Sequence, residues 1–430
     1  MNKKLIALAV AGALGAPLAA SAAPGDGVTL FGRVGVEYGS VKIDQAAGAS
    51  NYRQGSISDN AGASRWGLLI TEDLGSGLKA NARVEYGFRT GNGVVDLVRE
   101  QWVGLSGQNW GALQFGRVQS PFKDFAGGAS IDPFVTTNLQ ARGSGGAMYA
   151  PANGFGAAGF VDHAIRYNSP SWGGFSMALL ASPGDATQTD PTAIVTGTTQ
   201  ANGGNVGGKG GRANYQAGLK FKISSAGEIF GGYSHDAANN AQKAILTNGV
   251  NGDSEKVWRL GTAWTFGDFR LAAQYDKIKN ALAGNGGTTC SGGAQAGGGT
   301  TDAGITTAQC NTALNTNGDG AIWFLGTQYK IGKTTLVLQG GKTKGDALGT
   351  SVERESKNFT AGAIYSLSKR TRVFGGFQRV TIDGAGNNLV GVVVTPANIV
   401  NNTPNTTAAQ AAAAIQPDRN TWTIGMRHDF

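Results

Sequence analysis

Long hydrophobic runs are missing from this sequence after its first 23 residues. Histidine is also scarce, with three residues in 430, and cysteine occurs only twice. Because a membrane-spanning helix needs about 20 consecutive apolar residues, the chain beyond residue 23 is not expected to cross a membrane with helices. The shortage of histidine leaves few candidates for a catalytic base or a metal ligand.

The apolar run that is present, from Leu5 to Leu18, has the features of a secretory signal. Two lysines precede it, and the small residues Ala20-Ser21-Ala22 follow it as a cleavage site. We therefore predict a signal peptide at residues 1–22, or 1–23 if the cleavage site is one residue later, and a mature domain over 23–430. An N-terminal anchor is the alternative, but the run is short for a bilayer.

The two cysteines, Cys290 and Cys310, lie in one glycine-rich polar segment. In an oxidising compartment they could form a disulfide within a loop, and the sequence leaves open whether they are bonded. No histidine lies near them, so we expect no metal site there. The formal charge is +8, yet no basic run exceeds two or three residues, and nucleic acid is not an expected partner.

The dominant pattern is an alternation of apolar and polar residues with a period of two. In residues 77–89 the apolar side chains are those of Leu78, Ala80, Ala82, Val84, Tyr86 and Phe88. The residues between them are polar, mostly charged: Lys79, Asn81, Arg83, Glu85 and Arg89. A β-strand places these two sets on opposite faces, whereas a helix cannot.

The same alternation predicts 16 strands. An even number is typical of single-chain bacterial membrane barrels, and short turns alternate with long connections along the chain, as they do in such barrels. The face assignment of 370–382 is ambiguous. The predicted strands are 27–39, 64–73, 77–89, 99–107, 110–117, 161–168, 173–181, 212–222, 227–235, 255–266, 268–277, 320–330, 333–343, 356–366, 370–382 and 420–430.

Charges recur on the polar side of strand after strand, and aromatic residues lie near the strand ends. Both features favour a membrane barrel, with lipid outside and water inside, over a soluble sandwich. The 36 aromatic residues in patterned segments disfavour disorder, despite 70 glycines. A soluble adhesin with a sandwich fold remains an alternative.

Two features could control passage through such a barrel. The first is the long connection 118–160, which contains Lys123, Asp124 and Asp132. The second is a set of arginines on the polar faces of four strands near that connection. An ordinary surface loop and solvated lumen residues are the alternatives. The four arginines are Arg33, Arg65, Arg99 and Arg166.

Several segments resemble the general porins of β-proteobacteria, the neisserial and Burkholderia type. They are Leu30-Phe31-Gly32-Arg33, Ser64-Arg65-Trp66-Gly67-Leu68, Trp102-Val103-Gly104-Leu105-Ser106-Gly107, Phe115-Gly116-Arg117, Ile165-Arg166-Tyr167-Asn168-Ser169-Pro170 and the ending Gly425-Met426-Arg427-His428-Asp429-Phe430. The resemblance extends over the whole mature chain, but the loops are not specific.

The resemblance implies an all-β fold, a 16-stranded antiparallel transmembrane β-barrel whose third loop folds inward. It implies a homotrimer in the cell outer membrane that allows passive diffusion of small hydrophilic solutes and ions, without a cofactor. The expected partners are outer-membrane lipid, lipopolysaccharide and the barrel assembly machinery.

By the same resemblance, the four arginines form the basic wall of a constriction, with Lys123, Asp124 and Asp132 as candidates on the loop. Phe430 resembles the assembly signal. Relatives commonly carry a basic residue where this chain has Leu69, so any anion selectivity is expected to be weak.

Two other functions were weighed against general diffusion. An enzyme in a barrel needs a nucleophile and a base within reach, and His163, His235 and His428 lie in no such setting, so we expect no enzyme. A substrate-specific channel would carry a line of lumen aromatics, and the polar faces hold few, with Phe31 and Phe324 as exceptions.

Overall fold

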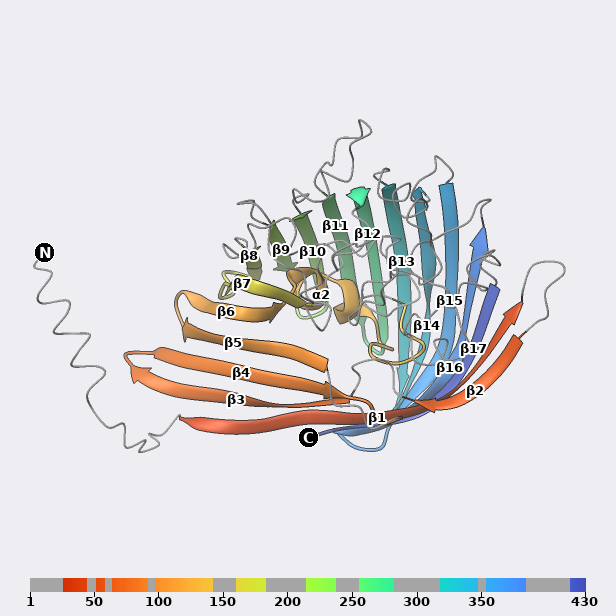
Figure 1. Ribbon diagram of the computed structural model, residues 1–430, viewed down its shortest axis with the longest axis horizontal. Helices are drawn as coiled ribbons and strands as arrows, with labels where there is room; N and C mark the ends of the chain where they lie inside the picture. Colours follow the sequence, from red (N-terminus) through yellow and green to blue (C-terminus); the bar gives the residue numbers. More distant parts are fainter. Residues whose placement is uncertain are drawn as a thin grey trace, which may run out of the picture.

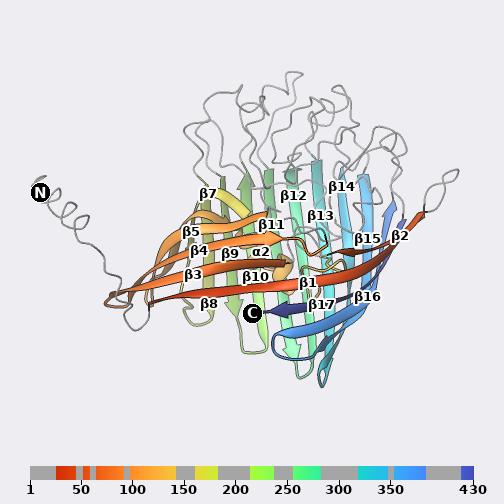
Figure 2. The same cartoon turned by 60° about the horizontal axis from the view of Figure 1, so that its bottom comes forward.

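One antiparallel sheet closes on itself to form a barrel, as Figures 1 and 2 show. The computed structural model describes residues 26–44, 52–58, 64–91, 97–141, 160–182, 214–236, 255–281, 318–346, 353–383 and 418–430. The predicted signal peptide and both cysteines lie outside these residues.

Strands account for most of the described chain. All 16 predicted strands are present, and the prediction of a 16-stranded barrel is confirmed. The strands are β1 (Gly27–Asp44), β2 (Tyr52–Ser58), β3 (Ser64–Gly75), β4 (Leu78–Phe88), β5 (Leu97–Gly107), β6 (Gly111–Gln119), β7 (Phe160–Asn168), β8 (Phe175–Ser182), β9 (Asn214–Lys222), β10 (Gly227–Asp236), β11 (Glu255–Phe266), β12 (Phe269–Ala281), β13 (Gly318–Ile331), β14 (Thr334–Asp346), β15 (Glu353–Ser366), β16 (Thr371–Asp383) and β17 (Asp418–Asp429).

Strand β2 was not predicted, because residues 40–63 have no clear alternation and were assigned to a connection. In the structure β1 continues to Asp44. Its residues 27–33 pair with β3, and its residues 37–43 pair with β2. Together β2 and β3 therefore occupy one position in a ring of 16. Gly55 permits this pairing, since a Cβ atom there would lie 2.4 Å from the Tyr38 hydroxyl.

The barrel closes where the first strand meets the last. The pairing of β1 with β17 runs from Arg33 opposite Asp429 to Asp44 opposite Asp418. A closed ring leaves no open sheet edge, which is what a hydrocarbon surrounding requires of a spanning sheet.

The two faces of the sheet differ as the alternation predicts. On β11, Trp258 and Leu260 are 41% and 63% exposed, while Val257 and Arg259, which alternate with them, are buried. The ambiguous strand β16 is now assigned: Phe377 contacts the exposed Trp422, with ring centroids 4.8 Å apart, and Gln378 points inward and is buried. The apolar face is thus the outer face.

Tight turns join the strands at one rim. Gly267 and Gly332 adopt φ angles of 59° and 58° in the turns after β11 and β13. Glycine enters this region without a steric cost, which is why these turns need it. In the described residues no helix is long and apolar enough to cross a membrane.

The segment that follows β6 contains two short helices, α2 (Pro121–Asp124) and η1 (Gly128–Ile131). Figure 1 shows α2 within the ring of strands. Phe122 and Ile131 share a buried cluster with Phe230 and Phe324 of the wall. A second buried cluster joins this segment to β14, β15 and β16, and consists of Phe134, Leu139, Val337, Ile364 and Phe374.

Glycines on the wall make room for this packing. A Cβ atom at Gly232 would lie 2.9 Å from the Phe122 ring, and one at Gly376 would lie 2.9 Å from Leu139. Part of the glycine excess is therefore explained by close contact between the wall and the segment 120–141.

Candidate functional site

The segment 120–141 is attached to the wall opposite its own strand by polar contacts. Arg259 of β11 donates from Nη1 to the carbonyl oxygens of Phe122, at 2.5 Å, and Ala126, at 3.0 Å. The same guanidinium is paired with Asp276, with Nε 2.8 Å from Oδ1. The backbone N–H of Gly128 donates to Gln274 Oε1 at 2.7 Å. These contacts hold the first half of the segment against β11 and β12.

Further contacts hold the second half. Gln339 of β14 donates to Asp132 Oδ1 at 3.0 Å. The backbone N–H of Asn138 donates to both carboxylate oxygens of Glu37 on β1, at 3.1 and 3.0 Å. The segment thus follows the inner face around to β1, beside the strands that carry the predicted arginines.

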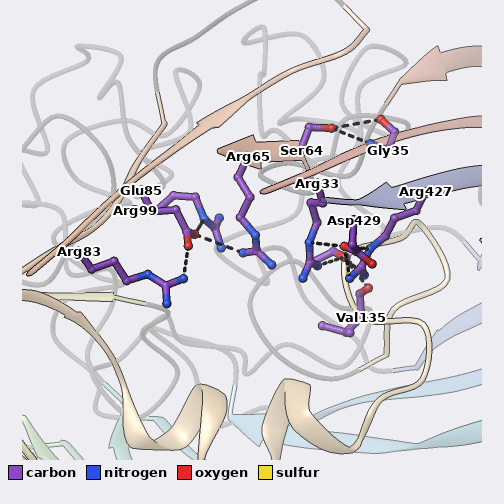
Figure 3. A network of polar contacts seen from close by, with 11 residues as sticks. Arg33, Gly35, Ser64, Arg65, Arg83, Glu85, Arg99, Val135, Arg427 and Asp429 are labelled. Carbon is purple, nitrogen blue, oxygen red and sulfur yellow. Dashed lines mark hydrogen bonds and ion pairs between the residues drawn. The ribbon is translucent and has the colours of Figure 1, made fainter. Parts of the chain in front are cut away.

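Three arginines surround one buried carboxylate on the wall near α2. The side chain of Glu85, which is fully buried, lies 3.5 Å from Arg65 Nη1 and is hydrogen-bonded to Arg83 and Arg99. Figure 3 shows the three guanidinium groups converging on it. Glu100 lies 3.4 Å from Arg83 Nη2, so two carboxylates face three arginines and this cluster keeps a net positive charge.

A second cluster lies where β1, β16 and β17 meet. Asp429 Oδ1 lies 3.3 Å from Arg33 Nε and 2.8 Å from Arg427 Nη2. Arg372 is opposite Arg427 in the register of β16 and β17. Arg33 also donates to the Thr136 hydroxyl at 3.4 Å, which links this cluster to the segment 120–141. Figure 3 shows the two clusters side by side.

The predicted partner Asp124 lies beside a predicted wall arginine. Arg166 Nη1 is 2.9 Å from Asp124 Oδ2 and 2.8 Å from the carbonyl oxygen of Gln119. The structure therefore brings together one arginine and one acid named from the sequence, across the base of the segment.

Lys123 lies over the ring of Phe160, with Nζ 3.7 Å from the centroid. Burial, with a further contribution from the charges of Arg99 and Arg65, holds the pKa of Lys123 well below its usual range. The Lys123 ammonium is thus neutralised at a lower pH than that of an ordinary lysine.

Asp132, the other predicted acid, is buried and has a local role. Its carboxylate accepts from the backbone N–H groups of Phe134, at 2.9 Å, and Ala141, at 2.6 Å, besides Gln339. These bonds fix the shape of the segment. From the sequence, Asp132 was only a candidate acidic partner of the wall arginines, because the conformation of the loop does not follow from the sequence pattern.

Sequence reasoning assigned no role to Glu85, Arg83, Arg372, Arg427 or Asp429. Their alternation placed Arg83 and Glu85 on a polar face, which was the available signal. The sequence pattern does not give the register. The register of β3, β4 and β5 places Arg65, Glu85 and Arg99 side by side, and the pairing of β1 with β17 places Arg33 beside Asp429.

Phe430, predicted as an assembly signal, lies at the closure of the barrel. Its backbone N–H donates to the Gly32 carbonyl, and its carbonyl accepts from the Gly32 N–H, both at 3.0 Å. Its ring covers Gly32, where a Cβ atom would lie 2.5 Å from it.

A closed barrel with an apolar outside, a charged inside and a segment held against its inner wall defines a class of protein, the transmembrane channel. Comparison with known proteins gives the family: the model of the Gram-negative porins matches residues 7–385. The chain belongs to the Gram-negative porin family, and it is a porin of the outer membrane.

Two curated relatives are named as outer membrane porins. A protein of Bordetella pertussis is 28% identical over 417 residues, which cover 87% of this chain and 93% of the relative. Outer membrane porin protein 32 of Delftia acidovorans is 29% identical over 391 residues, covering 87% of this chain and 88% of the relative. The predicted likeness to β-proteobacterial porins is confirmed.

Solved structures show the same fold. The anion-selective porin from Comamonas acidovorans superposes with a TM-score of 0.61 at 18% identity, covering 94% of this chain and all of that one. OmpF of Salmonella typhi gives a TM-score of 0.59 at 14% identity, covering 94% of this chain and 98% of that one. At these identities the likeness supports the fold alone.

Proposed function

We propose that this porin is a general diffusion channel with a weak preference for anions, narrowed by the segment 120–141. The observation that carries this proposal is the excess of arginine on one wall. In the two clusters of Figure 3, together with Glu100 beside Arg83, three carboxylates face a larger set of cations. That set comprises Arg33, Arg65, Arg83, Arg99, Arg372 and Arg427.

The position of these charges favours an effect on permeation. The segment 120–141 reaches both clusters, through Lys123 near Arg99 and through Thr136 near Arg33. A narrowed passage between low-dielectric walls concentrates the field of fixed charges, which raises the local concentration of anions. Leu69 contributes no charge at this level, which keeps the preference weak.

Reversal potentials in a KCl gradient test this proposal. We expect the wild-type channel to favour chloride, and Arg65→Ala and Arg99→Ala each to lower the chloride-to-potassium permeability ratio. Arg270→Ala is the matched control, because Arg270 lies beside the turn that precedes β12. A cation preference of the wild type, or an equal effect of the control, would contradict the proposal.

General diffusion is favoured over a substrate-specific channel by the surroundings of the lumen aromatics. The Phe31 ring carries the Arg83 guanidinium at 4.5 Å, and Phe324 is buried beneath the segment 120–141. Phe324 is therefore not available to a sugar ring, and one face of the Phe31 ring is covered. Addition of maltodextrins to a conducting bilayer tests this, since a specific channel would show saturable block of the ion current.

We also propose that the protein has no enzymatic activity. Its three histidines lie on β7, β10 and β17, which are far apart in the barrel order, and a catalytic triad needs them beside a nucleophile. Hydrolysis of phospholipid or ester substrates by the pure protein would contradict this.

A homotrimer is the proposed assembly, supported by OmpT of Vibrio cholerae, whose structure is described as a trimer form and superposes with a TM-score of 0.53. Mass measurement of the detergent-solubilised protein tests it.

The terminal Phe430 is proposed as the signal for the barrel assembly machinery. Phe430→Ala should reduce the amount of folded barrel in the outer membrane, and an unchanged amount would exclude that role.

A further inference from the structure

A single aromatic ring at the start of β7 lies against positively charged side chains from three other elements. Lys123 Nζ of α2 is 3.7 Å from the centroid of the Phe160 ring. The guanidinium carbons of Arg99 on β5 and Arg117 on β6 are 4.9 and 5.4 Å from the same centroid. A cation within about 6 Å of a ring centroid is attracted by the negative face of the ring. Phe160 is therefore a common contact of three cations.

Irregular strand pairing accompanies this arrangement. The register shifts at Arg99, where β4 pairs with β5, and at Arg117, where β6 pairs with β7. Such irregularities re-aim the side chains beside them and are common next to functional sites. His163, three residues after Phe160, has a φ angle of 49°, which is uncommon for a residue other than glycine. The wall thus departs from regular alternation where the three cations meet the ring.

Two of these cations are also held by carboxylates. Arg99 is hydrogen-bonded to Glu85, and Arg117 to Asp162. A carboxylate offsets the charge of the cation that it holds. An aromatic ring attracts a cation through its quadrupole and carries no net charge. The ring therefore offsets part of the repulsion between neighbouring cations while their positive charges remain.

Lys123 is the cation that depends most on the ring. The like charges of Arg99 and Arg65 act on its ammonium more strongly than the opposite charges of Glu100 and Asp124 do. Burial adds to the cost of the charged form. The direct contact with the aromatic ring opposes both effects.

We propose that Phe160 is a positioning residue of the passage, whose ring keeps the Lys123 ammonium and the Arg99 and Arg117 guanidinium groups together as one positive patch. This inference rests on the proposed anion preference and names an uncharged side chain on which that preference depends. An aliphatic residue at this position would fill space but would leave the repulsion between the cations without this offset.

Fluorinated rings test this role, because fluorine withdraws electron density from the ring face while the ring keeps nearly the same size. Mono-, di- and trifluorophenylalanine would replace Phe160 in the full-length barrel. Labelling of Lys123 with acetic anhydride over a pH series, read by mass spectrometry, reports the fraction of neutral amine. Since the ring stabilises only the charged form, the ratio of neutral to charged Lys123 at a given pH should rise with each fluorine. We expect a rise of about fivefold for the trifluorinated ring.

The matched control places the same trifluorinated ring at Phe31, which carries the Arg83 guanidinium at 4.5 Å instead. The labelling of Lys123 should then equal that of the wild type. Phe160→Tyr keeps an electron-rich ring and should also label as the wild type does. An electrophoretic mobility equal to that of the folded wild type shows that each barrel has formed.

The chloride-to-potassium permeability ratio is measured on the same barrels. Its fall with rising pH, which we assign to Lys123, should begin at a lower pH as fluorine atoms are added at Phe160. Labelling that stays constant along the series, or that changes as much when Phe31 is fluorinated, would overturn the role of Phe160. A graded change in labelling in a channel that prefers potassium would instead contradict the proposed function and leave the contact between Phe160 and Lys123 in place.

Discussion

Glu85 shows how one residue can set the charge of a channel wall. It is a buried carboxylate between three guanidinium groups, those of Arg65, Arg83 and Arg99. Buried carboxylates are tolerated when such partners satisfy them, and here the partners outnumber the acid. Glu85 contacts all three guanidinium groups and holds them close together, and we propose that their excess charge acts on passing ions.

Replacing Glu85 by Gln should therefore raise the anion preference and lower the stability of the barrel. The variant keeps the size of the side chain but removes the charge that offsets three arginines. The reversal potential in a KCl gradient should shift further toward chloride, and the temperature of barrel unfolding should fall. Glu228→Gln, which removes a carboxylate 3.8 Å from Lys220 on the same inner face, is the control and should change selectivity little. A shift toward potassium in Glu85→Gln would contradict this account.

We expect Lys123 to give the channel a dependence on pH. Because its pKa is lowered, its positive charge is complete at low pH and is lost as the pH rises through that lowered value, before an ordinary lysine with a pKa of about 10.4 is neutralised. The chloride-to-potassium permeability ratio should fall over this range. Lys123→Met should lack that step, whereas Lys330→Met, at the turn rim, should keep it. A step of equal size in Lys123→Met would exclude Lys123 as its source.

Among the elements, the segment 120–141 is the one that we propose narrows the passage through the barrel. Arg259 connects its first half to the wall through two carbonyl oxygens and is itself paired with Asp276. In the described part of the chain, the backbone–backbone hydrogen bonds of residues 120–141 lie within the segment itself. Its position against the wall therefore depends on side chains such as Arg259.

Replacing Arg259 by Met should release the first half of the segment. Breaking a buried ion pair by removing one partner costs about 3–5 kcal/mol, and the Phe122 and Ala126 carbonyls lose their donor. We expect a larger single-channel conductance with more open-channel noise. Arg270→Met is the control, and an electrophoretic mobility equal to that of the folded wild type shows that the barrel has formed. A smaller or unchanged conductance in a folded Arg259→Met barrel would contradict this role.

The strands were predictable from sequence because alternation is a local signal, and all 16 were found within a few residues of their bounds. Strand β2 was missed, since Tyr52–Ser58 contains polar residues and Gly55 and pairs only because β1 extends beyond β3. The arginine wall was partly predictable, as the faces of Arg33, Arg65 and Arg166 follow from the alternation. Arg99 faces inward because the register of β4 and β5 shifts beside it, since strict alternation would place it on the side of the exposed Val103. The clusters around Glu85 and Asp429 were not, because they depend on register and closure between distant parts of the chain.

For the whole molecule, positive charge is distributed unevenly on both the inner and the outer surface of the barrel. The inner surface is positive on the wall formed by β1, β3, β4, β5, β16 and β17, and the outer surface is positive at one rim of β11 to β16. Both rely on the same alternation, which sends neighbouring residues of a strand to opposite solvents.

The central claim is that the apolar face of the sheet meets lipid while the polar face meets water, and site-directed spin labelling tests it most directly. Labels at Leu325 and Gln328, on opposite faces of β13, would be introduced after Cys290 and Cys310 are replaced by Ser. In bilayers, the label at 325 should be relaxed by oxygen, which concentrates in lipid, and the label at 328 by a water-soluble nickel chelate. The reverse pattern, or access of the nickel chelate to both labels, would contradict the account.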